Sequence, residues 1–159
     1  MLTIHLVAVG AKTPHWVQQG WREYAKRIRG RCALELIEVG ALRRGNNPDL
    51  AAIARREGAR LQRAIPAGSR VIALDRAGKA HSTAQIARRM EAWMRDGART
   101  SQVALLAGGA EGLAPPVLDA ADEIWSLSAM TFAHPLVRVI IAEQIYRCYS
   151  LLEGLPYHR

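Results

Sequence analysis

Short apolar runs alternate with helically spaced apolar positions along the chain. Residues 2–9 form an apolar-rich run that Gly10 ends, which predicts a buried strand. Thr13 is placed to cap a following helix with Pro14 at its first position. The apolar positions of that helix recur at helical spacing: Val17, Trp21, Tyr24 and Ile28. The first unit is therefore a strand followed by a helix.

The same alternation continues to the end of the chain. Further strands are predicted at residues 33–39, 70–75, 102–107 and 124–127. Further helices are predicted at residues 49–65, 82–95 and 135–152, with a short one opened by Pro115 and Pro116. Ser82 and Gln85 complete a capping box for the helix that runs to about residue 95.

Alternation of this kind predicts an α/β fold with a mainly parallel sheet and helices on both faces. No internal repeat, low-complexity segment or linker divides the 159 residues, so we expect a single domain over residues 1–159. Ligands in such sheets bind beyond the carboxyl ends of the strands. The functional loops should therefore be those after the third, fourth and fifth strands: residues 75–81, 108–114 and 128–134.

The chain carries an excess of positive charge. Lys and Arg outnumber Asp and Glu by 22 to 14, which gives a formal net charge of +8. Such a charge favours a polyanionic partner through counterion release, and nucleic acid is the leading candidate. The alternative is that the excess only keeps a small protein soluble.

Cysteine usage and hydropathy indicate the compartment. Cys32 and Cys148 are too few and too far apart for a disulfide framework or a CxxC metal site, so we expect no bound metal. The N-terminus lacks the basic region of a secretory leader. Residues 136–152 are interrupted by charged side chains and fall short of a membrane span. These features predict a soluble, cytoplasmic protein with no membrane partner.

A glycine-rich turn, GGAEG at residues 108–112, directly follows the fourth predicted strand. Where side chains are absent, backbone amides can approach a ligand closely. The spacing matches neither the G-x-G-x-x-G pattern nor a phosphate-binding P-loop. A ligand-binding turn and a purely structural tight turn are therefore both compatible with this segment.

Residues 125–139 are more informative, because a strand leads into a loop of small and hydroxyl-bearing residues and then into a helix. The unpaired amides of the helix start, with the hydroxyls of Ser128 and Thr131, could hold the polar atoms of an adenosine. The apolar residues that would flank its ring are Leu127, Met130 and Phe132. Simple core packing is the alternative role for the last two.

Several of these segments resemble the RlmH family, small SPOUT enzymes that methylate large-subunit ribosomal RNA. The matching motifs are LLAGGAEGL at residues 105–113, SLSAMTFAHPLVRV at residues 126–139, and the chain end Pro156-Tyr157-His158-Arg159. The start LVAVGAKTPHWV and the central LIEV, ARREG and ALDRAGK stretches also look like the family, so the likeness covers the full length. Ala133 departs from the pattern, since the family is expected to have proline before His134.

The resemblance implies a SPOUT-type trefoil-knotted α/β fold and an obligate homodimer. It also implies a bent S-adenosyl-L-methionine held by the knot loops, within about residues 103–159. Carried onto this sequence, the cofactor contacts are Leu74, Gly108, Leu127, Ser128, Ala129, Met130, Thr131 and Phe132. The implied substrate is a pseudouridine in the helix 69 loop of 23S rRNA within the assembled ribosome, methylated at N3.

The substrate side is expected beside the cofactor loop. An imide nitrogen reacts as its proton leaves, and His134 is the first candidate to accept that proton, because imidazole titrates near neutral pH. Its alternative role is to cap the helix. Arg138 lies one turn further and is placed to face a uracil carbonyl or a phosphate, or else to form a salt bridge such as one with Glu143.

The chain terminus completes the expected site. In the family it is thought to lie over the active site across the dimer interface. We therefore expect Tyr157 and His158 to position the pseudouridine, with His158 the second candidate proton acceptor, and Arg159 to meet the RNA backbone. Arg43 and Arg44 lie in a basic loop and are expected to bind flanking RNA or else to be solvated surface.

Two other functions are compatible with the same patterns. One is a SPOUT methyltransferase that acts on tRNA, which the positive charge accommodates equally well. The other is a non-catalytic, ribosome-associated RNA-binding module, which would bind no S-adenosyl-L-methionine.

Overall fold

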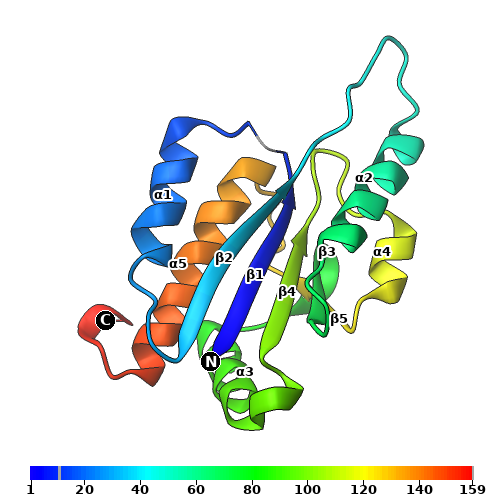
Figure 1. The fold of residues 1–159 in the computed structure, drawn as a ribbon. Helices are drawn as coiled ribbons and strands as arrows, with labels where there is room; N and C mark the ends of the chain where they lie inside the picture. The colour runs from blue at the N-terminus through cyan, green and yellow to red at the C-terminus, as the bar shows by residue number, and fades with distance from the viewer. Residues whose placement is uncertain (11, 159) are drawn as a thin grey trace.

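A computed structural model describes residues 1–10 and 12–158. Its strands form one parallel sheet of five in the order β2-β1-β4-β3-β5 (Figure 1). The strands are β1 (Leu2–Val9), β2 (Cys32–Val39), β3 (Arg70–Ala80), β4 (Gln102–Ala107) and β5 (Glu123–Ser126). The predicted α/β class and parallel sheet are therefore confirmed.

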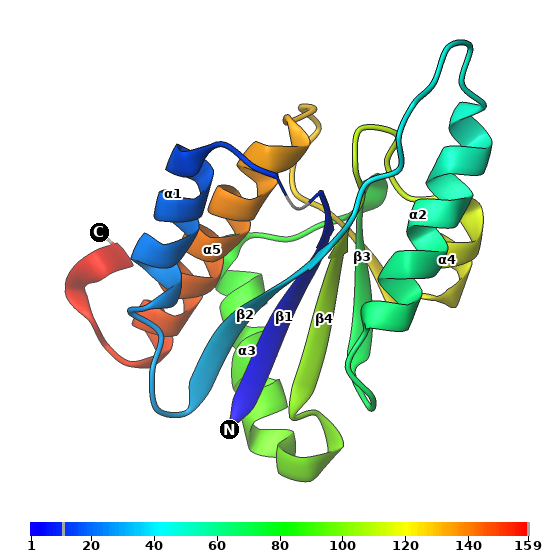
Figure 2. The same ribbon diagram turned by 45° about the horizontal axis from the view of Figure 1, so that its top comes forward.

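Helices cover both faces of this sheet. They are α1 (His15–Ala25), α2 (Leu50–Ala64), α3 (Thr83–Asp96), α4 (Pro115–Ala120) and α5 (His134–Leu152), with 3-10 turns at Gly97–Arg99 and Pro156–His158. α1, α5 and α3 lie against one face, and α2 and α4 lie against the other (Figure 2). Within the described residues, no helix combines the length and the apolarity that a membrane crossing needs.

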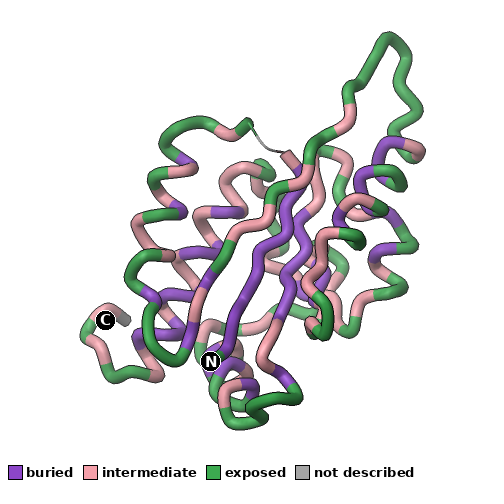
Figure 3. Tube along the Cα trace, viewed as in Figure 1, coloured by how far each residue is buried: buried purple, intermediate pink, exposed green. Residues whose placement is uncertain are grey.

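The central strands supply two hydrophobic cores. In β1, Ile4 and Leu6 pack towards α1, α3 and α5, whereas Val7 and Val9 pack towards α2 and α4. β1 and β4 are buried along nearly their whole length (Figure 3). Because a parallel sheet is covered on both faces, its central strands appear in the sequence as short continuous apolar runs rather than as alternating ones.

The helix starts were predicted with mixed success. The capping box is confirmed: the Ser82 hydroxyl accepts a hydrogen bond from the Gln85 amide at 3.2 Å, and the Gln85 side chain accepts one from the Ser82 amide at 2.8 Å. The cap at Thr13 is wrong. Pro14 holds the extended cap position, and α1 begins at His15. The fixed φ of proline suits this position as well as the first helical one, and the sequence does not separate the two.

The third strand differs most from its prediction. β3 continues past residue 75, yet Leu74 and Lys79 both register with Trp125 of β5, so residues 75–78 leave the ladder between them. A Cβ atom on Gly78 would lie 2.7 Å from backbone atoms of β5. Only a residue without a side chain allows the chain to pass so close. The trefoil knot itself stays a prediction.

Candidate functional site

The carboxyl ends of β3, β4 and β5 meet at a pocket of about 700 Å³. Its walls are residues 74–77, 107–112, 127–128 and 130–134, together with Val137. These segments belong to the three loops that the parallel-sheet argument predicted, and the fold brings them together from distant parts of the chain. The volume lies within the range of about 300–1,000 Å³ that is usual for small-molecule sites.

The glycine turn forms one wall of this pocket. The Gly112 amide donates to the Gly109 carbonyl at 3.0 Å, and Gly112 adopts a φ of +72°. A Cβ atom on Gly108 would lie 2.5 Å from the Gly112 carbonyl carbon and oxygen, and one on Gly109 would lie 3.1 Å from the Val9 side chain. The turn is therefore tight for structural reasons, and its bare backbone also lines the pocket.

The loop of residues 127–133 supplies another part of the wall. Its shape is held by hydroxyl groups: Ser126 donates to the Ser128 carbonyl at 3.1 Å, and the Ser128 hydroxyl accepts from the Met130 amide at 3.0 Å. Met130 is 68 % exposed, so core packing is wrong for this residue. Arg76 donates to the Thr131 hydroxyl at 2.6 Å and so joins this loop to β3.

Seven of the eight predicted cofactor contacts line the pocket: Leu74, Gly108, Leu127, Ser128, Met130, Thr131 and Phe132. Ala129 is exposed and is not part of the wall. The wall also contains residues that the sequence argument did not name, chiefly Asp75, Arg76 and Val137. Asp75 and Arg76 lie in the loop after the third strand, which was predicted to be functional. That prediction was the indication in the sequence that these two residues belong to the site.

His134 lies where the sequence placed it. It is the first residue of α5, is exposed, and lines the pocket. Ala133 holds the cap position, and no side chain of the described residues caps this helix start, so the capping role is wrong for His134. The amino end of α5, with its partial positive charge, therefore faces the pocket beside an imidazole.

Arg138 requires a correction. Its side chain is 2 % exposed and does not line the pocket. Nη1 donates to the Glu38 carboxylate at 2.7 Å, and Nη2 donates to the Gly10 carbonyl. It therefore does not face the pocket, where a uracil carbonyl or phosphate would bind, and its carboxylate partner is Glu38, while Glu143 pairs with Arg147. Arg138 ties α5 to the ends of β1 and β2.

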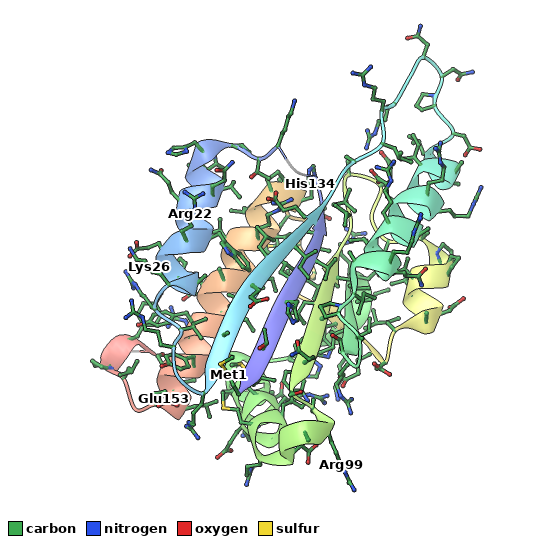
Figure 4. The ribbon with its side chains drawn as sticks, in the orientation of Figure 1. Met1, Arg22, Lys26, Arg99, His134 and Glu153 are labelled. Carbon is green, nitrogen blue, oxygen red and sulfur yellow. The ribbon has the colours of Figure 1, made fainter. Side chains whose placement is uncertain are left out.

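Tyr157 packs against the middle of α5 and does not line the pocket. Figure 4 shows His134 near one end of this helix and Glu153 near the other. The Tyr157 ring packs 4.6 Å from the Tyr146 ring, and its hydroxyl lies 3.1 Å from a Glu143 oxygen. Burial, with hydrogen bonds to Tyr24 and Glu143, raises the pKa of Tyr157 to about 12.

The rest of the terminus is described only in part. His158 ends the final 3-10 turn, and its side chain lies outside the description. Arg159 lies outside the described residues. Tyr157 is not part of the pocket wall: its hydroxyl contacts Glu143, which lies nine residues along α5 from His134, a helical rise of about 13.5 Å.

The loop that carries Arg43 and Arg44 projects from the molecule at the top of Figure 1. Both side chains are exposed. Arg44 also forms an ion pair with Glu111 of the glycine turn, and the Leu42 amide donates to the buried Glu57 carboxylate at 3.0 Å. The two predicted RNA-binding arginines therefore lie on a loop whose base is attached to the pocket wall.

Similarity to known proteins extends over nearly the whole chain. Residues 2–158 match a family model described as "Predicted SPOUT methyltransferase". The chain belongs to this SPOUT methyltransferase family. A "Ribosomal RNA large subunit methyltransferase H" from Thioalkalivibrio sulfidiphilus (strain HL-EbGR7) is 52 % identical over 99 % of this chain and 99 % of its own length. A protein of the same name from Pseudomonas putida (strain F1) is 46 % identical over 99 % of this chain and all of its own length.

One solved structure has a similar fold. The structure described as "Structural insights into the 2-OH methylation of C/U34 on tRNA" has a TM-score of 0.50 and 20 % identity, and covers 96 % of this chain and 98 % of its own. At this identity the likeness concerns the fold alone. The resemblance to the RlmH family and the SPOUT-type α/β fold, both predicted from the motifs, are confirmed.

Proposed function

We propose that this chain methylates large-subunit ribosomal RNA with S-adenosyl-L-methionine as the methyl donor. The observation that carries the proposal is the pocket at the carboxyl ends of β3, β4 and β5, which the predicted cofactor segments form together. Relatives that are 46–52 % identical over 99 % of this chain are named ribosomal RNA large subunit methyltransferases, which supports ribosomal RNA as the class of substrate. The net charge of +8 suits a polyanionic substrate.

The pocket residues fit this methyl donor. At Gly108 the wall is bare backbone, so a flat base can lie close against it. Leu74, Leu127 and Phe132 supply apolar walls, and the Thr131 hydroxyl supplies a polar partner. When bound, S-adenosyl-L-methionine supplies an electrophilic methyl group on its sulfonium.

The chain's own residues then have two tasks. The first is to hold the target nitrogen in line with the methyl group, which lowers the barrier without covalent catalysis. The second is to accept the proton that an imide nitrogen loses. His134 is positioned for the second task, because it lines the pocket at the amino end of α5, whose partial charge also favours a developing anion.

The active form in this proposal is a homodimer in which each pocket is completed by the terminus of the partner. Tyr157 packs against α5 outside the wall of its own pocket, which supports a contribution to a second copy of the chain. In that arrangement Tyr157 and His158 position the base, and Arg159, Arg43 and Arg44 meet RNA phosphates.

The target that we assign is N3 of a pseudouridine in the helix 69 loop of 23S rRNA, in the assembled ribosome and hence in the cytoplasm. A chain of 159 residues has little surface for sequence recognition, which supports an assembled ribosomal surface as the source of specificity. Free RNA should accordingly be a poor substrate.

The test is mass spectrometry of RNA nucleosides after incubation with the protein and isotopically labelled S-adenosyl-L-methionine. Unmethylated ribosomes, protein-free 23S rRNA and tRNA serve as parallel substrates. Labelled 3-methylpseudouridine from ribosomes alone is the expected result. Label in tRNA but not in ribosomes would favour a tRNA enzyme and overturn the proposal.

Calorimetry separates the enzyme from a binding module. Titration with S-adenosyl-L-methionine should give saturable heat at one site per chain. RNA binding without any such heat would favour the non-catalytic, ribosome-associated module instead.

A further inference from the structure

A second hollow, of about 430 Å³, lies between α3 and the β3–β5 edge of the sheet, apart from the cofactor pocket. Four of its wall residues are cationic: Arg70, Lys79, Arg88 and Arg89. Asp96 is an acidic wall residue at one end. We refer to this hollow as the basic groove. None of its wall residues contributes to the methyl-transfer pocket.

One cation of the groove is held in a fixed position. The Arg89 guanidinium lies 5.6 Å from the centre of the Trp93 ring and 5.7 Å from that of Trp125. It also pairs with Glu123, which accepts further hydrogen bonds from Arg70 at 3.2 Å and from the Trp125 indole at 2.9 Å. A guanidinium fixed in this way loses little side-chain entropy when it binds an anion.

Two other cations have no carboxylate to neutralise them. Lys79 and Arg88 are exposed, and within the part of the chain that the structure describes neither forms an ion pair. His81 lines the same groove, with its ring 4.8 Å from the Trp125 ring. Burial lowers the pKa of His81, and Lys79 and Arg89 lower it further, whereas Glu123 raises it. The groove is therefore a region of positive potential.

We propose that the basic groove binds the phosphate backbone of the RNA substrate and acts as a docking surface outside the methyl-transfer pocket. Arginine and lysine side chains are the usual partners of phosphate oxygens in RNA. β3 runs through both sites: residues 74–77 line the pocket and Lys79 lines the groove. An RNA strand held in the groove is therefore held beside the pocket. This inference rests on the proposed function, because it takes RNA as the substrate.

The test is a double variant, Lys79→Gln with Arg88→Gln, which removes two exposed cations and leaves the Arg89 cluster intact. Each lost phosphate contact should reduce the slope of log affinity against log salt by about 0.7 to 0.9. The wild type should therefore lose about 7- to 12-fold more affinity for ribosomes than the variant between 50 and 200 mM salt. KM for ribosomes should also rise, and by more at 50 mM than at 200 mM salt, with kcat and S-adenosyl-L-methionine affinity unchanged.

The matched control is Arg56→Gln with Arg63→Gln on α2. It removes the same charge from exposed positions on the other face of the sheet, and the salt slope should stay at the wild-type value. A control that weakens binding as much as the groove variant does would mean that total charge alone is responsible, and would overturn the inference. If the double variant melts early, the single variants Lys79→Gln and Arg88→Gln replace it. Each should reduce the salt slope by about half as much as the double variant.

Two failures are distinguishable. If the wild type methylates ribosomes and the groove variant keeps its KM and salt slope, the docking surface is refuted and the proposed function stands. If the wild type transfers no methyl group to ribosomes, the proposed function fails. The groove is then judged by filter binding to 23S rRNA, where an unchanged salt slope refutes it and a reduced slope supports it.

Discussion

Replacing Gly108 with alanine is the sharpest test of the cofactor pocket. The added methyl group would lie 2.5 Å from the carbonyl carbon and oxygen of Gly112. Both atoms belong to the backbone of the same tight turn, so no flexible side chain can move aside. Carbon atoms normally approach no closer than about 3.5 Å, so the two sides of the turn must separate by about 1 Å.

That displacement has two consequences of different size. Overpacking of this kind should lower the free energy of unfolding by about 1–3 kcal/mol, which is less than the roughly 5–15 kcal/mol that stabilises a typical folded protein. The same shift moves one wall of the pocket. A misplacement of about 1 Å at a reacting centre costs about 100-fold in rate, so methyl transfer should fall by about that factor and S-adenosyl-L-methionine should bind more weakly.

The assays are calorimetric titration with S-adenosyl-L-methionine, methyl transfer to ribosomes, and thermal melting. Gly45→Ala is the matched control, because nothing lies within 4 Å of a Cβ atom there and its φ is not positive. It should leave all three measurements unchanged. Wild-type affinity and rate in Gly108→Ala would show that the glycine turn is not a wall of the cofactor site.

Four further outcomes are expected. His134→Gln should slow methyl transfer about 10²- to 10⁴-fold with unchanged affinity for the cofactor, whereas the control His15→Gln at the start of α1 should not slow it. Equal rates of methyl transfer in the two variants would exclude His134 as the proton acceptor. Arg138→Met should lower the free energy of unfolding by about 3 kcal/mol, because a carboxylate and backbone carbonyls lose their donor; a melting temperature close to the wild type would contradict this. The raised pKa of Tyr157, about 12 against an ordinary 10, means that its protonated form stabilises the fold fully below pH 10 and that this contribution is lost as the pH rises through 12. The ultraviolet tyrosine titration should accordingly lose its step near pH 12 in Tyr157→Phe, and an unchanged titration would refute the assignment. Deleting residues 156–159 should abolish methylation, and mixed dimers of that chain with the glycine-turn variant should regain activity; mixtures that stay inactive would refute a terminus acting across the dimer.

The cofactor side of the site was largely predictable. Gly108 and Leu127 directly follow β4 and β5, and the ends of parallel strands gather at one edge of a sheet. Sequence periodicity therefore located the wall segments, and the family motifs selected residues within them. Arg76 was not named because its role depends on the Thr131 hydroxyl, 55 positions away in the chain.

The substrate side was less predictable. Arg138 occurs one turn into a helix beside the cofactor loop, which suggested a guanidinium that faces the substrate or forms a salt bridge such as one with Glu143. Its partners Glu38 and Gly10 lie 100 and 128 positions earlier, and they bury it instead. The basic groove was likewise not visible in the sequence, because Lys79 and Arg88 come from different elements that only packing brings together.

By itself the sequence determined the order of strands and helices, the class of sheet, and the edge of the sheet that carries the site. These properties follow from local periodicity, from where glycine and proline permit turns, and from the rule that parallel strands end at one edge. Tertiary structure alone decided which charged groups bind partners within the protein and stabilise the fold, as Arg138 does. It also decided which charged groups stay exposed and can bind a substrate, as Lys79 and Arg88 can. The physical reason is that the state of a charged side chain depends on its spatial neighbours, and those neighbours are distant in the chain.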